Sequence, residues 1–330
     1  MSKKRWAALG IAFLLLIVSL ISQATVSMAT NWDEMVAGWN SEYTEEVIKE
    51  GSLNKRIAVV PLEGVIQDDG EGSILSSSGY NHKRLLKYLD AAAEDDTVGG
   101  IIMRVNTPGG GVMESAEVHD KVVDIQKKHK KPVYVSMGNT AASGGYYVSA
   151  PAEKIVAHPS TLTGSIGVIM QTMDYSKLAD DLGIDFNTIK SGKYKDILSP
   201  TRKMTNDERD LLQTIIDQMY GEFVKVIVDG RGMSESKVRK LGDGRVYTGL
   251  QAKKNGLVDE LGSLDDTIAL MKKDHKMKGA EVFQYDGSGF LGSWAGVTMQ
   301  KAFGAERDFF GIREILNKSK TPRAMYLYTE

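Results

Sequence analysis

The 330-residue sequence contains no cysteine, and its positive and negative charges nearly cancel. The absence of cysteine excludes disulfides, cysteine-ligated zinc and a cysteine nucleophile. The formal net charge of −2 gives no indication of a general nucleic-acid-binding protein. With 42% hydrophobic and 25% charged residues, the chain can bury a substantial core and form one large or two modest domains.

Charge is also absent from a long stretch near the amino terminus. Residues 7–30 contain no charged side chain and follow a basic segment, residues 3–5. At 1.5 Å per residue, this run can span a hydrocarbon core about 30 Å thick. We therefore predict a transmembrane anchor over residues 1–30, with the basic flank in the cytoplasm and the remaining chain outside the cell membrane. The alternative is a cleaved signal peptide with its cleavage site at residues 27–29, which also exports the domain.

Beyond the anchor, apolar strands alternate with amphipathic helices. Residues 31–55 are polar and predict a stalk, and residues 56–283 form the predicted main domain. Within it, residues 98–106 have the apolar character of a parallel strand buried on both faces, and a long helix is predicted over residues 206–230. The alternation predicts an α/β fold built from βαβ crossovers. Residues 284–330 form a predicted C-terminal extension.

A serine stands among small residues in the sequence NTAASGGYY, which begins at Asn139. Ser143 follows a predicted strand and precedes an apolar helix. A nucleophilic serine at such a turn needs neighbours with small side chains so that a substrate carbonyl can approach. It also needs a backbone N–H beside it to hold the developing oxyanion, and Gly144 would supply one. Tight packing at the start of a helix is the alternative explanation for the small residues.

A second glycine-rich segment, RVNTPGGGV, follows the neighbouring predicted strand. Loops that follow neighbouring parallel strands lie together at the carboxyl end of a sheet. Glycines let their backbone N–H groups face a ligand with no side chain in the way. We therefore expect Gly110 and Gly144 to be placed where they can form an oxyanion hole, although a simple turn before a helix has the same composition.

A serine nucleophile requires a base, and the sequence offers histidine or lysine. Three of the five histidines lie in charged stretches and His119 lies in a helix, which leaves His158 as the histidine candidate. The lysine candidates are Lys193 and Lys195 in SGKYKDILSP, which follow a predicted strand over residues 185–192. A lysine base must be desolvated to be neutral near pH 7, because the ordinary lysine pKa is about 10.4.

Five motifs occur in an order that resembles the signal peptide peptidase A family of serine–lysine peptidases. They are RVNTPGGG, NTAASGGYY, STLTGSIGV, SGKYKD and GRVYTGLQAKKNGLVDELGS, and the resemblance extends from about residue 57 to about residue 268. It implies a Clp protease/crotonase-like fold, which is a βαβ superhelix. The chain length and the single anchor resemble the Gram-positive bacterial form of the family.

The resemblance implies a role for each matching residue. Ser143 is the expected nucleophile, Lys195 the general base, and Ser165 the residue that hydrogen-bonds the lysine amine and orients it. The two glycines named above are the expected oxyanion hole. In Clp protease a histidine stands near the position of Ser165, and its absence here counts against a histidine triad. If the lysine segment is extended, Lys193 points away from the site.

The activity that the resemblance implies is that of an exported, membrane-tethered serine endopeptidase. It would degrade short apolar peptides such as cleaved signal peptides through an acyl-enzyme, with no metal or cofactor, as a homo-oligomer of more than two subunits. Two alternatives remain open. One is a crotonase-type acyl-CoA enzyme, which shares the paired glycine N–H groups, and the other is an inactive membrane scaffold of the same fold.

The segment at residues 324–328 is apolar and aromatic, where chain ends are usually polar. The simpler interpretation is that this tail docks on its own domain or on the oligomer surface. The alternative is that it resembles a substrate and lies extended in the peptide groove, as a plug that the enzyme trims. In that case Met325 and Leu327 are expected in pockets on one face, with Tyr326 and Tyr328 facing the other way.

Overall fold

The computed structural model describes residues 43–68, 80–286 and 324–328. Residues 46–285 and 324–328 belong to one compact unit, whereas residues 43–45 and 286 belong to a second. The fold described below is that of the first unit.

The predicted anchor over residues 1–30 and most of the predicted C-terminal extension lie outside the described residues. Within the part of the chain that the structure describes, no helix is both long enough and apolar enough to cross a membrane.

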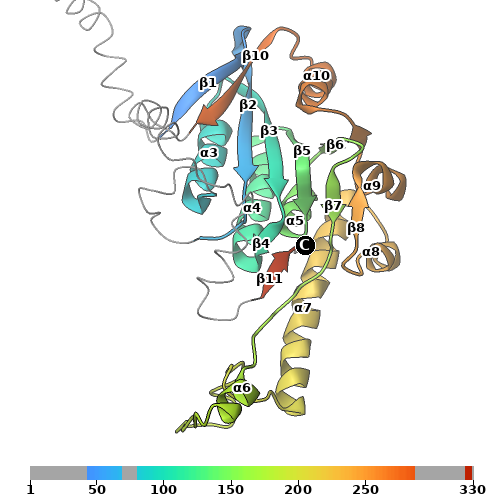
Figure 1. Cartoon of the computed structure of the whole chain (residues 1–330). Coiled ribbons are helices and arrows are strands. Elements are labelled where there is room, and N and C mark those ends of the chain that lie inside the picture. Colours follow the sequence, from blue (N-terminus) through green and yellow to red (C-terminus); the bar gives the residue numbers. More distant parts are fainter. Residues whose placement is uncertain (1–42, 69–79, 287–323, 329–330) are drawn as a thin grey trace, which may run out of the picture. The chain divides into compact units, whose positions relative to one another are not determined.

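A nine-stranded sheet forms the centre of the described chain (Figure 1). Seven strands follow one another in the order β1-β10-β2-β3-β5-β6-β9, and β7 pairs with both β5 and β8. From β10 to β9 every pairing along that order is parallel, as is β5 with β7, whereas β7 and β8 are antiparallel. The strands are β1 (Thr44–Lys49), β2 (Ser52–Glu63), β3 (Val98–Thr107), β5 (Val133–Ala142), β6 (Lys154–Ala157), β7 (Leu162–Gly164), β8 (Val246–Thr248), β9 (Glu260–Leu261) and β10 (Ala280–Asp286).

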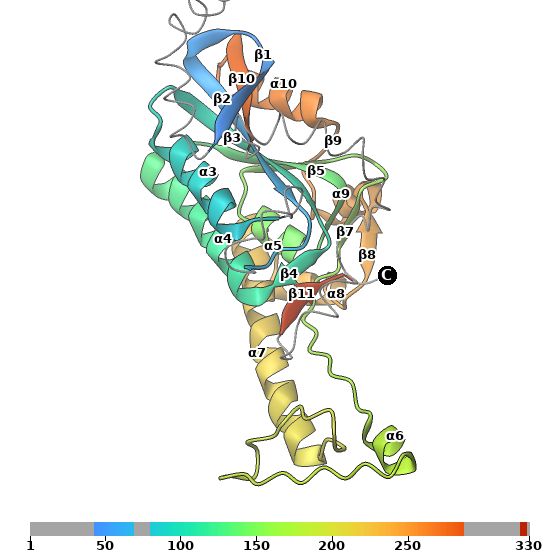
Figure 2. The ribbon, with the colours of Figure 1, turned by 60° about the vertical axis from the view of Figure 1, so that its left-hand side comes forward.

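Helices cover both faces of the sheet, which is why its central strands are apolar throughout (Figure 2). On one face, Ile268 and Met271 of α10 pack with Ile102 and Tyr134 of the sheet. On the other face lie α3, α4 and α5. The helices are α3 (His82–Glu94), α4 (Val112–Asp124), α5 (Gly144–Ser149), α6 (Ser176–Asp181), α7 (Asn206–Arg231), α8 (Glu235–Leu241), α9 (Gly249–Asn255) and α10 (Leu264–Asp274), and a π-helix (Ile125–His129) continues α4.

The helix α7 connects the sheet to a projecting segment. It begins at a capping box between Thr205 and Glu208, and its carboxyl-terminal half packs on α5, where the rings of Phe223 and Tyr147 lie 5.1 Å apart. Its amino-terminal half extends away from the sheet beside residues 170–205, which we call the arm and which include α6 (Figure 2).

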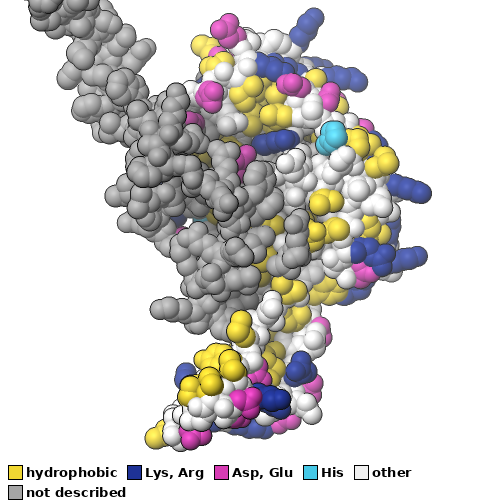
Figure 3. Space-filling view, viewed as in Figure 1, with side chains coloured by type: hydrophobic (Ala, Val, Ile, Leu, Met, Phe, Trp, Pro, Cys, Tyr) yellow, Lys and Arg dark blue, Asp and Glu magenta, His cyan; other side chains and the backbone are white. Residues whose placement is uncertain are grey.

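The arm exposes an unusual number of large apolar side chains. In Figure 3 they gather at the lower end of the view, on the part of the surface that the arm forms. Exposed apolar patches of this kind mark interaction surfaces. The exposed residues are Met173, Tyr175, Leu178, Leu182, Ile184, Phe186, Ile189 and Tyr194.

The predicted α/β fold and the long helix are confirmed, but one local prediction was wrong. Residues 185–192 form no strand, because this alternating segment has no neighbouring strand to pair with on the arm. The predicted stalk over residues 31–55 contains β1 and the first residues of β2. Their side chains are mostly exposed, so the apolar alternation that reveals a strand is missing, while the backbone still pairs at the sheet edge.

Candidate active site

Ser143 occupies the turn between β5 and α5 in a conformation that few residues other than glycine adopt. Its φ is 53° and its ψ is −114°, and it is 1% exposed. Its N–H donates to the carbonyl of Gly164 at 2.7 Å, and its own carbonyl accepts from Tyr146 and Tyr147 at 2.9 Å each. These bonds at both ends hold a strained backbone, which is typical of a functional turn.

The glycine strand β4 (Gly109–Gly111) lies beside this turn. On one side it pairs with Ile66, whose N–H donates to Gly109 and whose carbonyl accepts from Gly111. Because hydrogen-bonding groups alternate between the two sides of a strand, the N–H of Gly110 points away from Ile66. A methyl group on Gly144 would lie 3.1 Å from that nitrogen. The two predicted glycines are therefore adjacent, at the carboxyl ends of neighbouring parallel strands.

Gly144 is the first residue of α5, so its N–H has no partner within the helix. Gly109, with a φ of 106°, approaches the same point. A methyl group on Gly109 would collide with the carbonyl oxygen of Tyr326 and would lie 2.7 Å from the nitrogen of Gly144. The carbonyl of Tyr326 thus lies beside the first N–H of α5, immediately after Ser143.

The tail reaches this position as a strand. The short strand β11 (Met325–Leu327) pairs antiparallel with β4 and sets Tyr326 opposite Gly110. One residue further on, the N–H of Tyr328 donates to the carbonyl of Pro108 at 2.8 Å. On its other side β11 pairs with Ile169, which exchanges hydrogen bonds of 2.9 and 3.0 Å with Met325. The tail is therefore held between two backbone segments.

The side chain of Tyr326 fills an aromatic pocket beside α5 and α7. It is 1% exposed and stacks on Tyr147 at 4.9 Å between ring centroids, with Phe223 at 4.7 Å. Its hydroxyl donates to the carbonyl of Met219 at 3.2 Å. Burial raises the pKa of Tyr326 and raises the pKa of Tyr147 to about 12, so both hydroxyls stay neutral.

Met325 and Leu327 pack with Val65 on one face of β11 and Tyr326 lies on the other, so the predicted alternation is confirmed. The prediction did not include a pocket for Tyr326 itself. Register against β4 decides which face is buried, and alternation over five residues does not reveal it. Sequence reasoning also missed Tyr147 and Phe223 as pocket residues, although the paired tyrosines directly after the SGG turn were a signal.

A backbone hydrogen bond connects Ser143 to the residue that precedes Ser165. Ser165 follows Gly164, whose carbonyl accepts the Ser143 N–H, and its own N–H donates to Arg245 at 2.9 Å. Like Ser143 it is a buried non-glycine residue with positive φ, here 49°. The structure thus brings Ser143, Ser165 and the two predicted glycines together.

Lys195, in contrast, lies on the arm far from Ser143. Its neighbour Asp196 pairs with Arg202 at 2.7 Å, and Arg202 pairs with Glu208 at 2.5 Å in the first turn of α7. The bond from Arg202 lowers the pKa of Glu208 to about 2, so this attachment is ionic at neutral pH. From Glu208 to Phe223, where α7 meets the tyrosine pocket, the helix rises roughly 20 Å. Within one chain the structure does not bring Lys195 to Ser143.

The other candidate bases have local partners. Lys193 pairs with Asp207 at 2.5 Å, whereas Lys195 is exposed and forms no ion pair within the described part of the chain. His158 accepts a hydrogen bond from the N–H of Ser160, and His119 pairs with the carboxylate beside it in sequence. No group of three or more possible metal ligands occurs among the described residues.

Comparison with known proteins decides the family. A family model described as Peptidase family S49 matches residues 125–278. A protein of Enterococcus faecium, named as a candidate signal peptide peptidase SppA, is 40% identical over 99% of each chain. The chain belongs to peptidase family S49. Protease 4 of Haemophilus influenzae is 35% identical over 66% of this chain and 34% of its own length, and the chloroplastic serine protease SPPA of Arabidopsis thaliana is 33% identical over 66% and 32%.

Membership of family S49 makes this protein a serine peptidase, a hydrolase that acts on peptide substrates. The predicted peptidase activity is confirmed. The comparisons support neither the acyl-CoA enzyme nor the inactive scaffold.

Proposed function

We propose that Ser143 is the nucleophile of this S49 peptidase and that the N–H groups of Gly110 and Gly144 form its oxyanion hole. The observation that carries the proposal is that a methyl group on Gly109 would meet both the Tyr326 carbonyl oxygen and the nitrogen of Gly144, so this carbonyl lies near that nitrogen. A peptide carbonyl bound there lies next to the serine. Preorganised N–H donors at the site of developing charge are a large source of rate acceleration.

The base in the proposed mechanism is the neutral amine of Lys195. It takes the proton of the Ser143 hydroxyl as the oxygen attacks the peptide carbonyl, and the glycine N–H groups hold the resulting oxyanion. The protonated amine then gives that proton to the leaving amine, which departs and leaves an acyl-enzyme. A water molecule, deprotonated by the same lysine, releases the acyl group and restores the serine. These steps require neither a metal nor a cofactor.

Lys195 is supplied by a neighbouring copy of the chain in this proposal. Within one copy it lies on the arm, separated from Ser143 by the length of α7 described above. A lysine acts as a base near neutral pH only when it is desolvated, and Lys195 is exposed in the single chain. Docking against a neighbour's groove would both bury the amine and bring it to the serine.

The apolar side chains of the arm support this assembly. An arm that docks on a different surface of the next copy makes a heterologous contact, and such contacts form a ring when the rotation between successive copies closes. We therefore propose a homo-oligomer of more than two subunits. In it, every active site combines the serine of one subunit with the lysine of the next.

Several broader assignments belong to the same proposal. The parallel sheet with crossover helices supports a Clp protease/crotonase-like fold. The uncharged run at residues 7–30 supports a membrane anchor, with the catalytic domain outside the cytoplasm. The name of the Enterococcus relative supports signal peptides as substrates. The buried aromatic pocket beside the serine suits the apolar side chains of such peptides.

The tail is proposed to act as a substrate-like plug, with Tyr326 as the residue whose carbonyl is attacked. The support is its strand pairing with β4 and Ile169, which is how extended peptides bind at a sheet edge. A tethered segment reaches an effective concentration of about millimolar, so even weak binding fills the groove.

Labelling with a fluorophosphonate tests the nucleophile. We expect the wild-type protein to gain the phosphonyl mass on the peptide that contains Ser143, because the oxyanion hole also stabilises a phosphonyl oxygen. Ser143→Ala should not be labelled. Label on a different serine, or equal labelling of Ser143→Ala, would contradict the assignment.

Replacing Ser165 by alanine is expected to lower kcat roughly 10- to 100-fold while the protein stays folded, because the hydroxyl orients the base without bonding to substrate. The pH–rate profile should shift as well, since a misplaced lysine amine loses its neutral, oriented form. Circular dichroism checks the fold. An unchanged rate and an unchanged profile would remove Ser165 from the site.

A further inference from the structure

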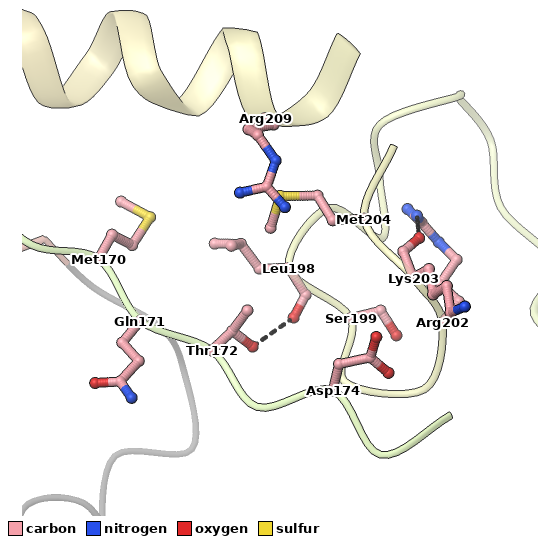
Figure 4. A pocket seen from close by; sticks show the side chains of 10 residues that line it. All are labelled: Met170, Gln171, Thr172, Asp174, Leu198, Ser199, Arg202, Lys203, Met204 and Arg209. Carbon is pink, nitrogen blue, oxygen red and sulfur yellow. Dashed lines mark hydrogen bonds between the residues drawn. The ribbon is translucent and has the colours of Figure 1, made fainter. Parts of the chain in front are cut away.

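The arm carries a pocket of about 490 Å³ that the mechanism above does not use (Figure 4). It lies between the chain that leaves the active site, the end of the arm and the first turns of α7. Its size is within the range of pockets that bind a side chain or a small ligand. The lining residues are Met170, Gln171, Thr172, Asp174, Leu198, Ser199, Arg202, Lys203, Met204 and Arg209.

The pocket combines apolar walls with an unneutralised positive charge. Met170, Leu198 and Met204 face one another across it, and the guanidinium of Arg209 points in among them (Figure 4). Arg209 is exposed and makes no ion pair with any of the described residues. Its helix neighbour Asp207 is already paired with Lys193.

The other charges of the pocket largely compensate one another. Arg202 is bound by Asp196 and Glu208, as described above. Hydrogen bonds from Ser176 lower the pKa of the Asp174 carboxyl, and the nearby charge of Lys203 lowers it further. Arg209 is the cation whose side chain points in among the apolar walls of the pocket (Figure 4).

A peptide that binds in the same register as the tail would extend toward this pocket. Met325 lies opposite Ile169, and the two backbones run antiparallel. A peptide bound in the same way continues backward past residues 170–172. If the residue with the attacked carbonyl is counted as the first, the fifth residue on its acyl side lies opposite Thr172. At about 3.3 Å per residue, this stretch covers roughly 13 Å.

The length of α7 gives a similar distance between the active site and the pocket. The hydroxyl of Tyr326 meets α7 at Met219, and Arg209 lies ten residues earlier on that helix, which is roughly 15 Å. The peptide and the helix thus run side by side for about the same length, and the pocket is at the far end of both.

We propose that this pocket is a distal subsite for the fifth acyl-side residue of the substrate and that Arg209 determines its specificity. The inference rests on the function proposed above. The pocket favours an apolar or acidic side chain and disfavours lysine or arginine, because a like charge beside Arg209 is repelled. For a signal peptide, whose basic flank precedes its apolar segment, the subsite directs cleavage away from that flank and into the apolar segment.

The chain's own tail carries an apolar residue, Pro322, at the fifth acyl-side position, but cations flank it in the sequence. In the sequence, Arg323 is the fourth acyl-side residue from Tyr326, and Lys320 is the seventh. If the tail binds in the proposed register, these cations face Arg209 and weaken the binding of the tail, so a better-matched peptide displaces it.

Charge reversal tests the subsite. Three peptides that differ only in carrying Glu, Gln or Lys as the fifth acyl-side residue are compared by kcat/KM. For the wild-type enzyme we expect Glu to exceed Lys roughly 3- to 10-fold, which is the size expected for a partly exposed ion pair and its like-charge counterpart. Arg209→Glu should reverse the order, and Arg209→Gln should abolish the difference.

Two controls separate the pocket from general electrostatics. Lys225→Glu makes the same change of charge on an exposed residue of α7 outside the pocket, and it should keep the wild-type order. A second peptide set carries Glu or Lys two residues after the scissile bond. For this set, Arg209→Glu should not change the order of kcat/KM. Equal kcat/KM for the three test peptides, or a reversal with the control set, would overturn the subsite. Failure of the wild-type enzyme to cleave any peptide would overturn the proposed function and the subsite with it.

Discussion

Two inactive variants, Ser143→Ala and Lys195→Ala, are expected to restore peptidase activity when they are assembled together. Each variant alone should lose at least about 1,000-fold in kcat, because nucleophile and base act as a unit. In a mixed ring, a Lys195→Ala subunit still supplies a serine and a Ser143→Ala subunit still supplies a lysine. Random assembly in equal amounts places them in the productive order at about a quarter of the sites in a heterologous ring.

The experiment is done by co-expressing the two variants with different affinity tags and purifying assemblies that carry both. Activity towards a short apolar peptide should reach about a quarter of the wild-type value, as expected for random heterologous assembly. Lys193→Ala is the matched control, since it removes a nearby arm lysine and should retain most activity. If the mixed assembly stays inactive although both tags are present, serine and lysine come from the same chain and the arm has to move.

A second expected result is that the active protein cleaves its own tail after Tyr326, releasing residues 327–330, whereas Ser143→Ala keeps them. The Tyr326 carbonyl lies at the proposed oxyanion hole, so the peptide bond between Tyr326 and Leu327 is the one in position to be cleaved. Intact mass spectrometry of the two proteins distinguishes the forms directly. A protein that ends at residue 320 should cleave added peptides faster than an untrimmed chain, because no tethered segment competes for the groove.

Substitution within the tail gives this prediction a sharper control. Tyr326→Asp places a charge in the aromatic pocket of Tyr147 and Phe223 and should abolish trimming, because an unpaired buried carboxylate is costly. Tyr328→Asp changes a less buried tail residue in the same way and should leave trimming largely intact. Full-length masses for wild type and Ser143→Ala, with equal peptide cleavage by the truncated chain, would show that the tail has no role at the site.

The turn that carries the proposed nucleophile could be predicted from the sequence because its requirements are local. A strand, a turn of small residues and a helix must follow one another directly, and the sequence around Ser143 contains all three. The glycine N–H groups were equally accessible, because parallel neighbouring strands bring the loops that follow them to one edge of the sheet. For both features a few consecutive residues contain the information.

Features that depend on pairing between distant segments were not predictable in this way. Residues 185–192 alternate like a strand, yet strand formation requires a neighbour, and the arm provides none. The orientation of Tyr326 depends on its register against Gly110, which is more than 200 positions away in the sequence. A motif around Lys195 identifies a candidate base, but no pattern within one chain says which copy of the chain receives it.

The separation of serine and lysine on the two ends of α7 has a consequence for the protein before it assembles. If a neighbouring copy supplies the base, as proposed, a solitary subunit cannot cleave the chains that surround it during synthesis and export. Activity then depends on encounters between subunits, and at low abundance it rises more steeply than in proportion to the amount of protein. The proposed attachment to a membrane surface would raise the rate at which subunits meet, so attachment would itself favour the active assembly.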